Sequence, residues 1–388
     1  MTAPTKEKQF PLRWQGLSKN DTTVLKAVGI TLILLHNFFH LLPGWMIENE
    51  FSFSSKNFNS FRDHLSLNGY DVVGLLFAYL GHYGVQLFVF LSAYGLYSSY
   101  QHKPLRYGPF ISDRLWKLWP TFFLAVLFFL AFTFITTRTF HHPDLFIGIL
   151  LRLTFVSNLV PGESLTVVGP WWFYSMIFQF YLIFPLLRKG FNKYGLVFLV
   201  CLSLFCLALV NLFLYRFSAT GVFPIALVIG HMSVICLGLA LAKYKNIPMP
   251  IWVLLVALAV LFLSNWYMKA WLFSRICVTI FFLYGYVFAK QVIHIGDGWI
   301  RKTLFFVGDL SMYLFAVNGF LRAPFLQLTE QHTNSGIKFL ILVVYLSFVA
   351  GVAMLLRLTE KYVLQLLSNK RHAERHSSNS TQPGTLIN

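Results

Sequence analysis

The sequence predicts an all-α polytopic membrane protein with about ten transmembrane helices and one short re-entrant or interfacial segment. Of its 388 residues, 57% are hydrophobic and 18% are aromatic, whereas only 12% are charged. This composition is typical of an integral membrane protein, in which repeated apolar segments take the place of one soluble core. The apolar segments lie at roughly 24–42, 72–98, 118–137, 145–160, 170–187, 195–215, 222–242, 249–268, 272–290, 304–327 and 338–357.

The charges between these segments indicate how many of them cross the membrane. The segment 145–160 is the shortest, contains Arg152 and Asn158, and ends at VPGES, so we expect it not to cross. With ten crossings, most of the 31 Lys and Arg residues fall on one side together with both termini. The positive-inside rule identifies that side as the cytoplasm. The expected topology therefore has ten spans and two cytoplasmic termini.

The remaining segments of the chain complete this organisation. Residues 1–23 are expected to be a cytoplasmic N-terminus, because the first apolar segment lacks the small-residue exit of a cleaved signal peptide. Residues 24–367 form the membrane domain, and the basic, then Ser/Asn-rich segment 368–388 is expected to be a disordered cytoplasmic tail. The four cysteines lie within apolar segments and have no metal-site spacing. The net charge of +17 follows from the topology, so we expect membrane lipids and no nucleic acid as partners.

His36 is the most informative residue, because it is ionisable and lies inside the first apolar segment. It follows Lys26 by ten residues, which is about 15 Å along a helix or about half the hydrocarbon depth. An ionisable side chain there is costly and indicates a functional site. A histidine that bonds one helix to another is the alternative interpretation. His82 and His231, which lie in later apolar segments, are better explained as packing or pore-lining histidines.

The distribution of acids separates catalysis from ion-coupled transport. All fourteen Asp and Glu residues lie in loops, at span ends or in the tails. Coupled transporters commonly need an acid inside the membrane, so several imidazoles without one favour acid–base chemistry on a bound substrate. His36 and His40 share a helix face and could bind a metal. Because neither a carboxylate nor a cysteine is expected nearby, we predict no metal site.

Five stretches in order cover almost the whole chain and form a pattern, namely LKAVGITLILLH (25–36), GVQLFVFLSAYGLY (84–97), DRLWKLWP (113–120), GPWWFYSMIFQFYLIFPLL (169–187) and GDLSMYLFAVNGFLR (308–322). Together they resemble the integral-membrane acyltransferase-3 family, which acylates sugars and cell-surface polymers.

The sequence departs from the family pattern at several positions. The family usually has Arg and ten intervening residues before its histidine, whereas here Lys26 and nine residues precede His36. Ala93 replaces a glycine, Ile177 and Phe178 stand where a glutamate is common, and Asn318 stands where a late histidine is common. An amide, a hydroxyl or a backbone carbonyl would then have to orient His36 in place of the missing acid.

The resemblance implies a catalytic role for His36, either as a general base or as a covalent acyl carrier. It implies acyl-CoA, most simply acetyl-CoA, as the donor substrate, with no bound cofactor. Arg114 and Lys117 lie one helical turn apart, so two cations with adjacent indoles suit phosphates and an adenine. Basic residues that only flank a span are the alternative. The acyl-CoA site is expected at Lys26, Arg114 and Lys117.

Four further residues are expected to support the site, namely Asn37, Ser92, Trp172 and Tyr181. The hydroxyls of Ser92 and Tyr181 could bond His36 or the thioester carbonyl, or could join helices. Trp171 and Trp172 could stack on a sugar, although residues of the interfacial aromatic belt are the favoured interpretation.

The expected function is transfer of an acyl group, most simply acetyl, from cytoplasmic acyl-CoA. The acceptor would be a hydroxyl of a cell-surface polysaccharide or lipid-linked glycan, and the location a bacterial inner membrane. An exporter of polysaccharide or lipid-linked sugar is the alternative. A non-catalytic subunit that binds acyl-CoA or lipid is a third possibility.

Overall fold

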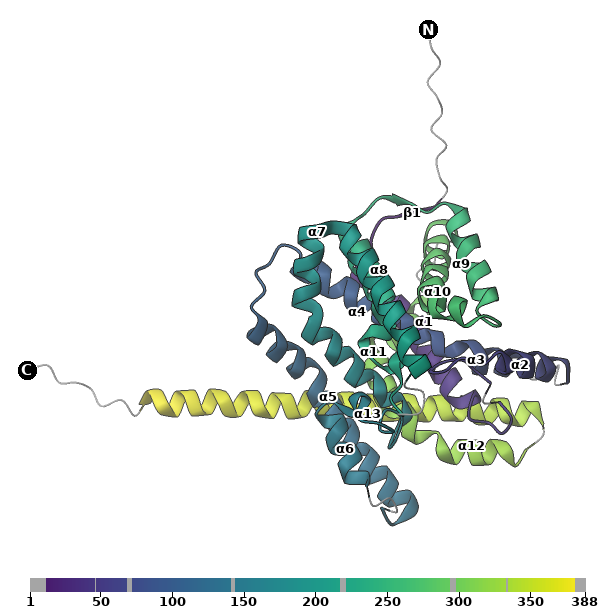
Figure 1. Cartoon of the computed structure of the whole chain (residues 1–388). Helices are drawn as coiled ribbons and strands as arrows, with labels where there is room; N and C mark the ends of the chain where they lie inside the picture. Colours follow the sequence, from purple (N-terminus) through teal and green to yellow (C-terminus); the bar gives the residue numbers. More distant parts are fainter. Residues whose placement is uncertain are drawn as a thin grey trace, which may run out of the picture.

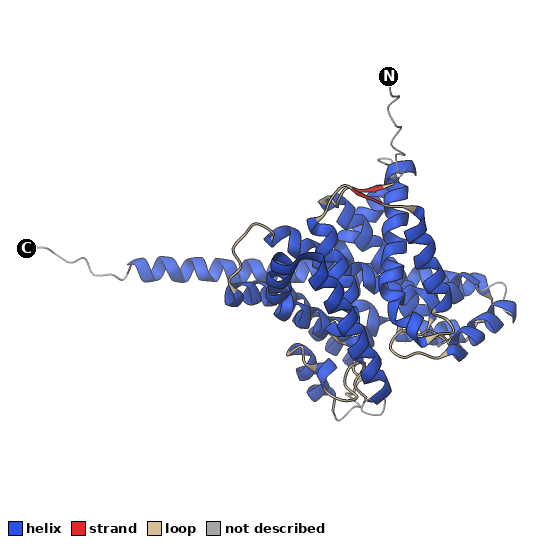
Figure 2. Cartoon of the chain, turned by 45° about the horizontal axis from the view of Figure 1, so that its top comes forward, coloured by secondary structure: helices blue, strands red, loops and turns tan. Residues whose placement is uncertain are grey.

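The chain folds into a bundle of helices with one small sheet (Figures 1 and 2). The computed structural model describes residues 12–45, 47–67, 72–140, 144–216, 221–293, 298–332 and 334–380. Strand β1 (Arg13–Trp14) pairs antiparallel with β2 (Ile247–Pro248), with Arg13 opposite Pro248. The α-helices are α1 Lys19–Phe39, α2 Ser55–Leu67, α3 Val72–Leu80, α4 Gly84–Tyr100, α5 Tyr107–Thr137, α6 Leu145–Leu153, α7 Trp172–Arg216, α8 Met232–Lys243, α9 Ile251–Leu263, α10 Met268–Phe288, α11 Trp299–Leu321, α12 Ala323–Glu330 and α13 Ser335–Ser380. The prediction of an all-α membrane protein is confirmed.

Seven helices in the described part of the chain are long and apolar enough to cross a membrane. They are Lys19–Phe39, Val72–Tyr100, Tyr107–Thr137, Gly169–Leu214, Met268–Gln291, Trp299–Leu321 and Ser335–Asn369. The helix α7 contains a non-helical residue, Gly195 (φ 65°, ψ −149°), which divides it into two segments. The apolar helices α8 and α9 are shorter. Ten crossings stay a prediction. That count requires four separate crossings here, one by each of the two segments of α7, one by α8 and one by α9.

The segment expected not to cross forms only a short helix. Helix α6 has nine residues, which is about 14 Å of helix and less than half the hydrocarbon thickness. It ends at Leu153, and a short 3₁₀ turn at Ser157–Leu159 follows.

Helix α1 lies at the centre of the bundle, against α3, α4 and α11. Small residues allow these close contacts. A Cβ at Gly308 of α11 would collide with the backbone oxygen of Thr23 on α1. A Cβ at Gly84, where α4 begins, would lie 2.5 Å from the backbone oxygen of Gly29. The packing therefore holds the later part of α1, which carries His36, between α3 and α11.

Both ends of the membrane domain differ from the sequence-based expectation. Helix α1 begins at Lys19, five residues early, because Ser18 and Asp21 form a capping box. Helix α13 continues through Ser380 and projects beyond the bundle (Figure 1), so part of the expected disordered tail 368–388 is helical. No glycine or proline interrupts the sequence between Gly351 and Pro383, which is compatible with the longer helix. Residues 1–11 and 381–388 lie outside the described residues.

Candidate active site

His36 lies in the last turn of α1. The side chain is buried, with 2% of its surface exposed. Its Nδ1 lies 3.1 Å from the carbonyl oxygen of Ala78 and 3.3 Å from that of Phe77, both on α3. Because carbonyl oxygens only accept hydrogen bonds, Nδ1 carries the proton in this arrangement. The lone pair of the neutral ring is then on Nε2, the nitrogen that a general base requires free.

Two further histidines surround His36. The ring of His40 stacks on it, with centroids 4.2 Å apart and planes 7° apart. His40 Nδ1 lies 2.7 Å from the backbone oxygen of His36, so it also donates to a carbonyl. The His82 ring stands 5.5 Å away at a steep angle, from the 3₁₀ turn Gly81–Tyr83 between α3 and α4. Three imidazoles therefore meet where α1 ends and α4 begins.

A carboxylate from the loop after α1 faces the free nitrogen of His36. Glu50 Oε2 lies 3.6 Å from His36 Nε2. The loop is fixed from α10, because Arg275 donates to the Glu50 carbonyl oxygen at 2.9 Å and the Trp271 indole donates to that of Asn49 at 2.7 Å. The expectation that no carboxylate lies near these histidines is therefore wrong. The sequence places Glu50 outside the spans, but the loop folds back onto the end of α1.

Burial raises the pKa of both acids in this loop. The pKa of Glu50 is raised to about 8, an effect of burial that the charges of Arg275 and Arg322 partly offset. The pKa of Glu48 is raised to about 7 by burial and by the like charge of Glu50. Both carboxyls therefore change charge near neutral pH, where an acid in water would be ionised.

A cavity of about 170 Å³ joins these groups to residues from three other parts of the chain. The cavity is lined by Ile33, His36, Asn37, His40, Glu48, Glu50, Phe51, His82, Val85, Leu165, Gly169, Pro170, Trp172, Phe315 and Arg322. The Asn37 amide donates to Asn318 Oδ1 at 2.7 Å, and Arg322 donates to the Asn37 carbonyl oxygen at 3.1 Å. Asn318, at the family's late-histidine position, thus holds a neighbour of His36.

The two adjacent tryptophans are buried, so the favoured interpretation of them as belt residues is wrong. Trp171 has no exposed surface, and its indole donates to the Ala316 carbonyl oxygen at 2.9 Å. Trp172 is 4% exposed, lines the cavity and stacks on His231, with centroids 5.6 Å apart. Trp171 ends the short turn Gly169–Trp171, in which Pro170 is also buried, and Trp172 begins α7.

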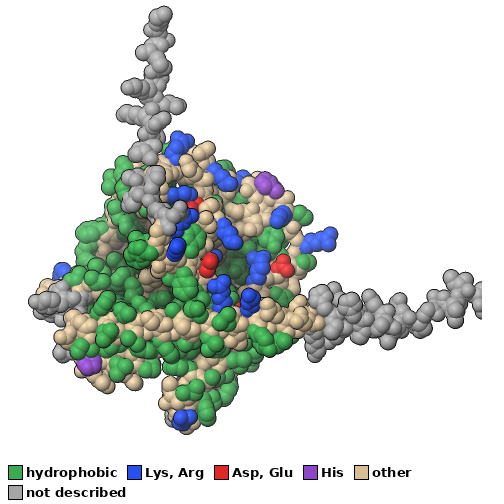
Figure 3. All heavy atoms as spheres, turned by 180° about the vertical axis from the view of Figure 1, so that it is seen from behind, with side chains coloured by type: hydrophobic (Ala, Val, Ile, Leu, Met, Phe, Trp, Pro, Cys, Tyr) green, Lys and Arg blue, Asp and Glu red, His purple; other side chains and the backbone are tan. Residues whose placement is uncertain are grey.

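The structure brings only three of the expected site residues to this cavity, namely His36, Asn37 and Trp172. The others are outside its described lining. Lys26 is half-buried on α1, and Ser92 is half-buried on α4. Arg114 lies over the Phe110 ring on α5 and interacts electrostatically with Tyr181 of α7, while Lys117 is exposed. Figure 3 shows Lys and Arg side chains gathered around a hollow with a hydrophobic floor on one face of the bundle.

The cluster of His36, His40 and Glu48 could be considered for a metal, because their ligand atoms lie within 4.8 Å of one another. The ring geometry does not suit two imidazole ligands. A metal requires nitrogen lone pairs that converge on one point, whereas stacked rings with planes 7° apart direct their in-plane lone pairs side by side. The stacked geometry therefore does not favour a metal that is held by both rings.

Sequence reasoning missed four residues of this cavity: Glu48, Glu50, His82 and Arg322. A signal was present for the acids, since the motif IENE follows the span that carries His36 within a few residues. Arg322 ends the last of the family-like stretches, but a basic residue at a span end has an ordinary topological explanation. Nothing in the sequence distinguishes His82 from a packing histidine.

The comparisons with known proteins give one match. A family model described as an acyltransferase domain matches residues 21–358, which is nearly the whole chain. No curated protein and no solved structure matches the chain significantly.

Proposed function

The chain belongs to the acyltransferase-3 family, and on this premise we propose that it moves an acyl group from cytoplasmic acyl-CoA to a sugar hydroxyl. Acetyl-CoA is the simplest donor, and a cell-surface polysaccharide or lipid-linked glycan is the proposed acceptor. The observation that carries this proposal is the His36 ring, whose Nδ1 is held by two carbonyls while Nε2 faces Glu50, another residue of the cavity lining. A ring fixed in this tautomer is prepared to accept a proton.

The reaction needs one proton to move through His36. Nε2 takes the proton from the acceptor hydroxyl as the hydroxyl oxygen attacks the thioester carbonyl carbon. The tetrahedral intermediate then collapses, the carbon–sulfur bond breaks, and the leaving thiolate takes the proton from Nε2. The products are the acylated sugar and free CoA, and the neutral ring is restored.

Two charged side chains suit the charges that develop during this step. Glu50, 3.6 Å from Nε2, would stabilise the imidazolium formed on His36. Arg322 lines the same cavity and would stabilise the negative oxygen of the tetrahedral intermediate. Asn37 keeps Arg322 in place through its carbonyl oxygen.

The donor would enter from the face where α1 begins. Lys26 precedes His36 by ten residues on α1, a separation of about 15 Å. An extended pantetheine arm spans such a gap, with Arg114 and Lys117 on α5 as the proposed contacts of the CoA phosphates. Both termini would then lie in the cytoplasm of a bacterial cell and the protein in its inner membrane.

Variants of the two stacked histidines test the proposal. Purified protein in nanodiscs would be given acetyl-CoA, and released CoA thiol would be measured together with acetylation of cell-surface glycans in cells. We expect His36→Ala to lower transfer by about 10²–10⁴-fold, the usual contribution of a general base. His40→Ala is the matched control, because the His40 ring lies on the same helix face, stacks on His36 and donates from Nδ1 to the His36 backbone oxygen. A His36→Ala variant that inserts and retains more than about a tenth of the activity would contradict the assignment, and no consumption of acetyl-CoA by wild-type protein would favour the exporter.

A further inference from the structure

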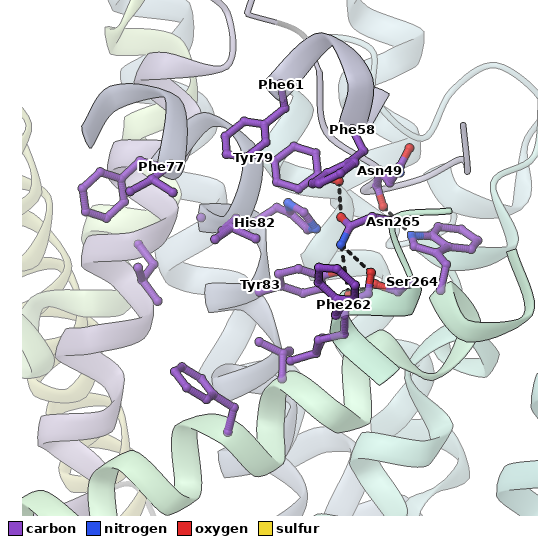
Figure 4. A pocket seen from close by; sticks show the side chains of 18 of the residues that line it. Asn49, Phe58, Phe61, Phe77, Tyr79, His82, Tyr83, Phe262, Ser264 and Asn265 are labelled. Atoms are coloured by element: carbon purple, nitrogen blue, oxygen red, sulfur yellow. Dashed lines mark hydrogen bonds between the residues drawn. The ribbon is translucent and has the colours of Figure 1, made fainter. Parts of the chain in front are cut away.

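A large apolar cavity lies beside the His36 cavity, between the α2–α3 hairpin and the α9–α10 pair. Its volume is about 650 Å³, within the usual range of ligand sites. The lining is mostly aliphatic and aromatic and comprises Leu32, Asn49, Phe58, Phe61, Val73, Leu76, Phe77, Tyr79, Leu80, Gly81, His82, Tyr83, Leu258, Leu261, Phe262, Ser264, Asn265, Trp271, Val278, Phe281 and Phe282. Figure 4 shows its aromatic side chains around an open space. The cavity therefore suits a hydrocarbon.

The cavity opens sideways, between helices, and not only toward the loops. Val73 of α3 and Phe262 of α9, which both line the cavity, are 65% and 63% exposed. In a membrane-spanning bundle such apolar surface faces lipid tails. A hydrocarbon chain could pass from the bilayer into the cavity without leaving an apolar environment.

Polar groups are confined to one end of the cavity. The Tyr79 hydroxyl donates to Asn265 Oδ1 at 2.5 Å, and Asn49 lies next to Glu50 in the loop after α1 (Figure 4). Glu50, the next residue, faces His36 Nε2 at 3.6 Å. An amphipathic molecule in the cavity would therefore place its polar part near the reactive histidine.

His82 connects this cavity with the His36 cavity. It lines both of them and also a small space that contains Glu50, Gln86 and Arg275. The side chain is only 6% exposed, and within the described residues the Tyr79 backbone is the one hydrogen-bond contact of its ring, which leaves a ring nitrogen without a partner. A buried polar group without a partner is costly, so a ligand that supplies one is favoured. Its ring centroid is 5.5 Å from that of His36.

We propose that the acceptor is attached to a membrane-embedded hydrocarbon chain, and that this chain lies in the cavity between α3 and α9–α10 while its sugar passes His82 to reach His36. The inference rests on the proposed acyltransferase function and narrows its acceptor to a lipid-linked sugar. His82 would hydrogen-bond the sugar or its linking group. The cations Arg275 and Arg322, on the walls of the adjoining spaces, suit an anionic link such as a phosphate.

A long acyl chain on the donor fits this cavity less well. The proposed donor site is at the opposite end of α1, so a donor chain would have to pass beyond the reacting carbonyl carbon to enter the cavity. An acceptor approaches His36 from the cavity side without crossing that point. The lateral opening, the polar end and the position of His82 therefore all favour the acceptor.

Photo-crosslinking with matched tryptophan variants tests this assignment. The probe is a polyisoprenyl phosphate that carries a diazirine in its chain, added to the protein in phosphatidylethanolamine–phosphatidylglycerol nanodiscs. We expect crosslinks on peptides that contain Leu76 and Leu258. Leu258→Trp, which fills the cavity, should lower labelling about tenfold. Leu255→Trp is the control, because Leu255 lies on the same helix and is 58% exposed but outside the described lining.

Competition and a second readout separate the possible outcomes. Unlabelled polyisoprenyl phosphate should displace the probe, whereas an equal amount of dioleoyl phosphatidylglycerol should not. Equal displacement by both would mean that the cavity holds ordinary bilayer lipid and would overturn the proposal, as would equal labelling of the two variants. Leu255→Trp should also keep the acceptor-independent hydrolysis of acetyl-CoA that His36→Ala loses. If His36→Ala retains hydrolysis, the proposed function fails, whatever the crosslinks show.

Discussion

Replacement of Glu50 by glutamine tests whether a loop carboxylate assists the membrane histidine. The change keeps the size and hydrogen-bonding capacity of the side chain and removes its ability to ionise. Its loop should stay in place, because Arg275 and Trp271 bind the backbone of residues 49 and 50 and not the carboxylate. The variant therefore isolates the charge opposite His36 Nε2.

The distance of 3.6 Å sets the size of the effect. With an effective dielectric constant of about 20, Coulomb's law gives about 4.6 kcal/mol for two unit charges at this separation, as an upper bound. At 3.6 Å the two groups do not form a hydrogen bond, but if they approach in the transition state, a charge-assisted hydrogen bond would contribute about 1.5–3 kcal/mol. If Glu50 stabilises the imidazolium only in the transition state, its loss should slow transfer by about 10–150-fold.

The pH dependence gives the sharper test. Burial raises the pKa of Glu50 to about 8, so its carboxylate is mostly protonated at pH 7 and ionises as the pH rises. The wild-type kcat should therefore increase from pH 7 to above pH 8, whereas Glu50→Gln should lack this increase. The difference between the two proteins should be largest at high pH and small near pH 6.

The assay is CoA-thiol release in nanodiscs across this pH range, with protein-free samples to correct for spontaneous thioester hydrolysis. Glu330→Gln is the control, because Glu330 is an exposed carboxylate at the end of α12. The reasoning is refuted if Glu50→Gln keeps the wild-type pH profile, or if both variants lower kcat equally.

Two predictions concern the opposite face of the protein. The double change Arg114→Gln and Lys117→Gln should raise the KM for acyl-CoA about tenfold or more, since each lost charge-assisted contact is worth about 1.5–3 kcal/mol. Lys193→Gln is the control. If the KM of the double variant equals that of the control, Arg114 and Lys117 only flank the span and do not bind the donor. A cysteine placed at Lys193, which is exposed, should be protected from an impermeant thiol reagent in intact cells and react once the membrane is opened; labelling from outside would contradict a cytoplasmic position and with it the ten-span topology.

The fold class could be predicted because hydrophobicity depends little on tertiary contacts. Eleven apolar segments and a shortage of charge are enough to indicate an all-α membrane protein. The helix boundaries were harder. The polar stretch around Arg188 and Lys193 indicates a loop, yet α7 continues through it as far as Gly195. Where a helix emerges from the hydrocarbon, its backbone hydrogen bonds form whether its side chains are polar or apolar. The polarity of the side chains alone therefore does not mark where the helix ends.

The site could be predicted only where the residues lie on neighbouring turns of one helix or in a family-like stretch. His36 and Asn37 are adjacent, and Trp172 belongs to such a stretch. The approach of Glu50 to His36 depends on a loop that returns over α1 and is bound by α10. Residues so far apart in sequence as Glu50 and Arg275 have no common pattern in a single sequence.

The position of Glu50 also accounts for a departure from the family pattern. The usual glutamate positions are occupied by Ile177, which is 2% exposed, and Phe178, which packs against Phe155. A carboxylate there would be buried among apolar side chains at a high desolvation cost. A carboxylate on the loop has a lower cost, because it remains partly solvated and lies near Arg275 and Arg322. We infer that Glu50 provides the carboxylate opposite His36. Helix α7 can then pack with the apolar side chains of Ile177 and Phe178 in place of a glutamate.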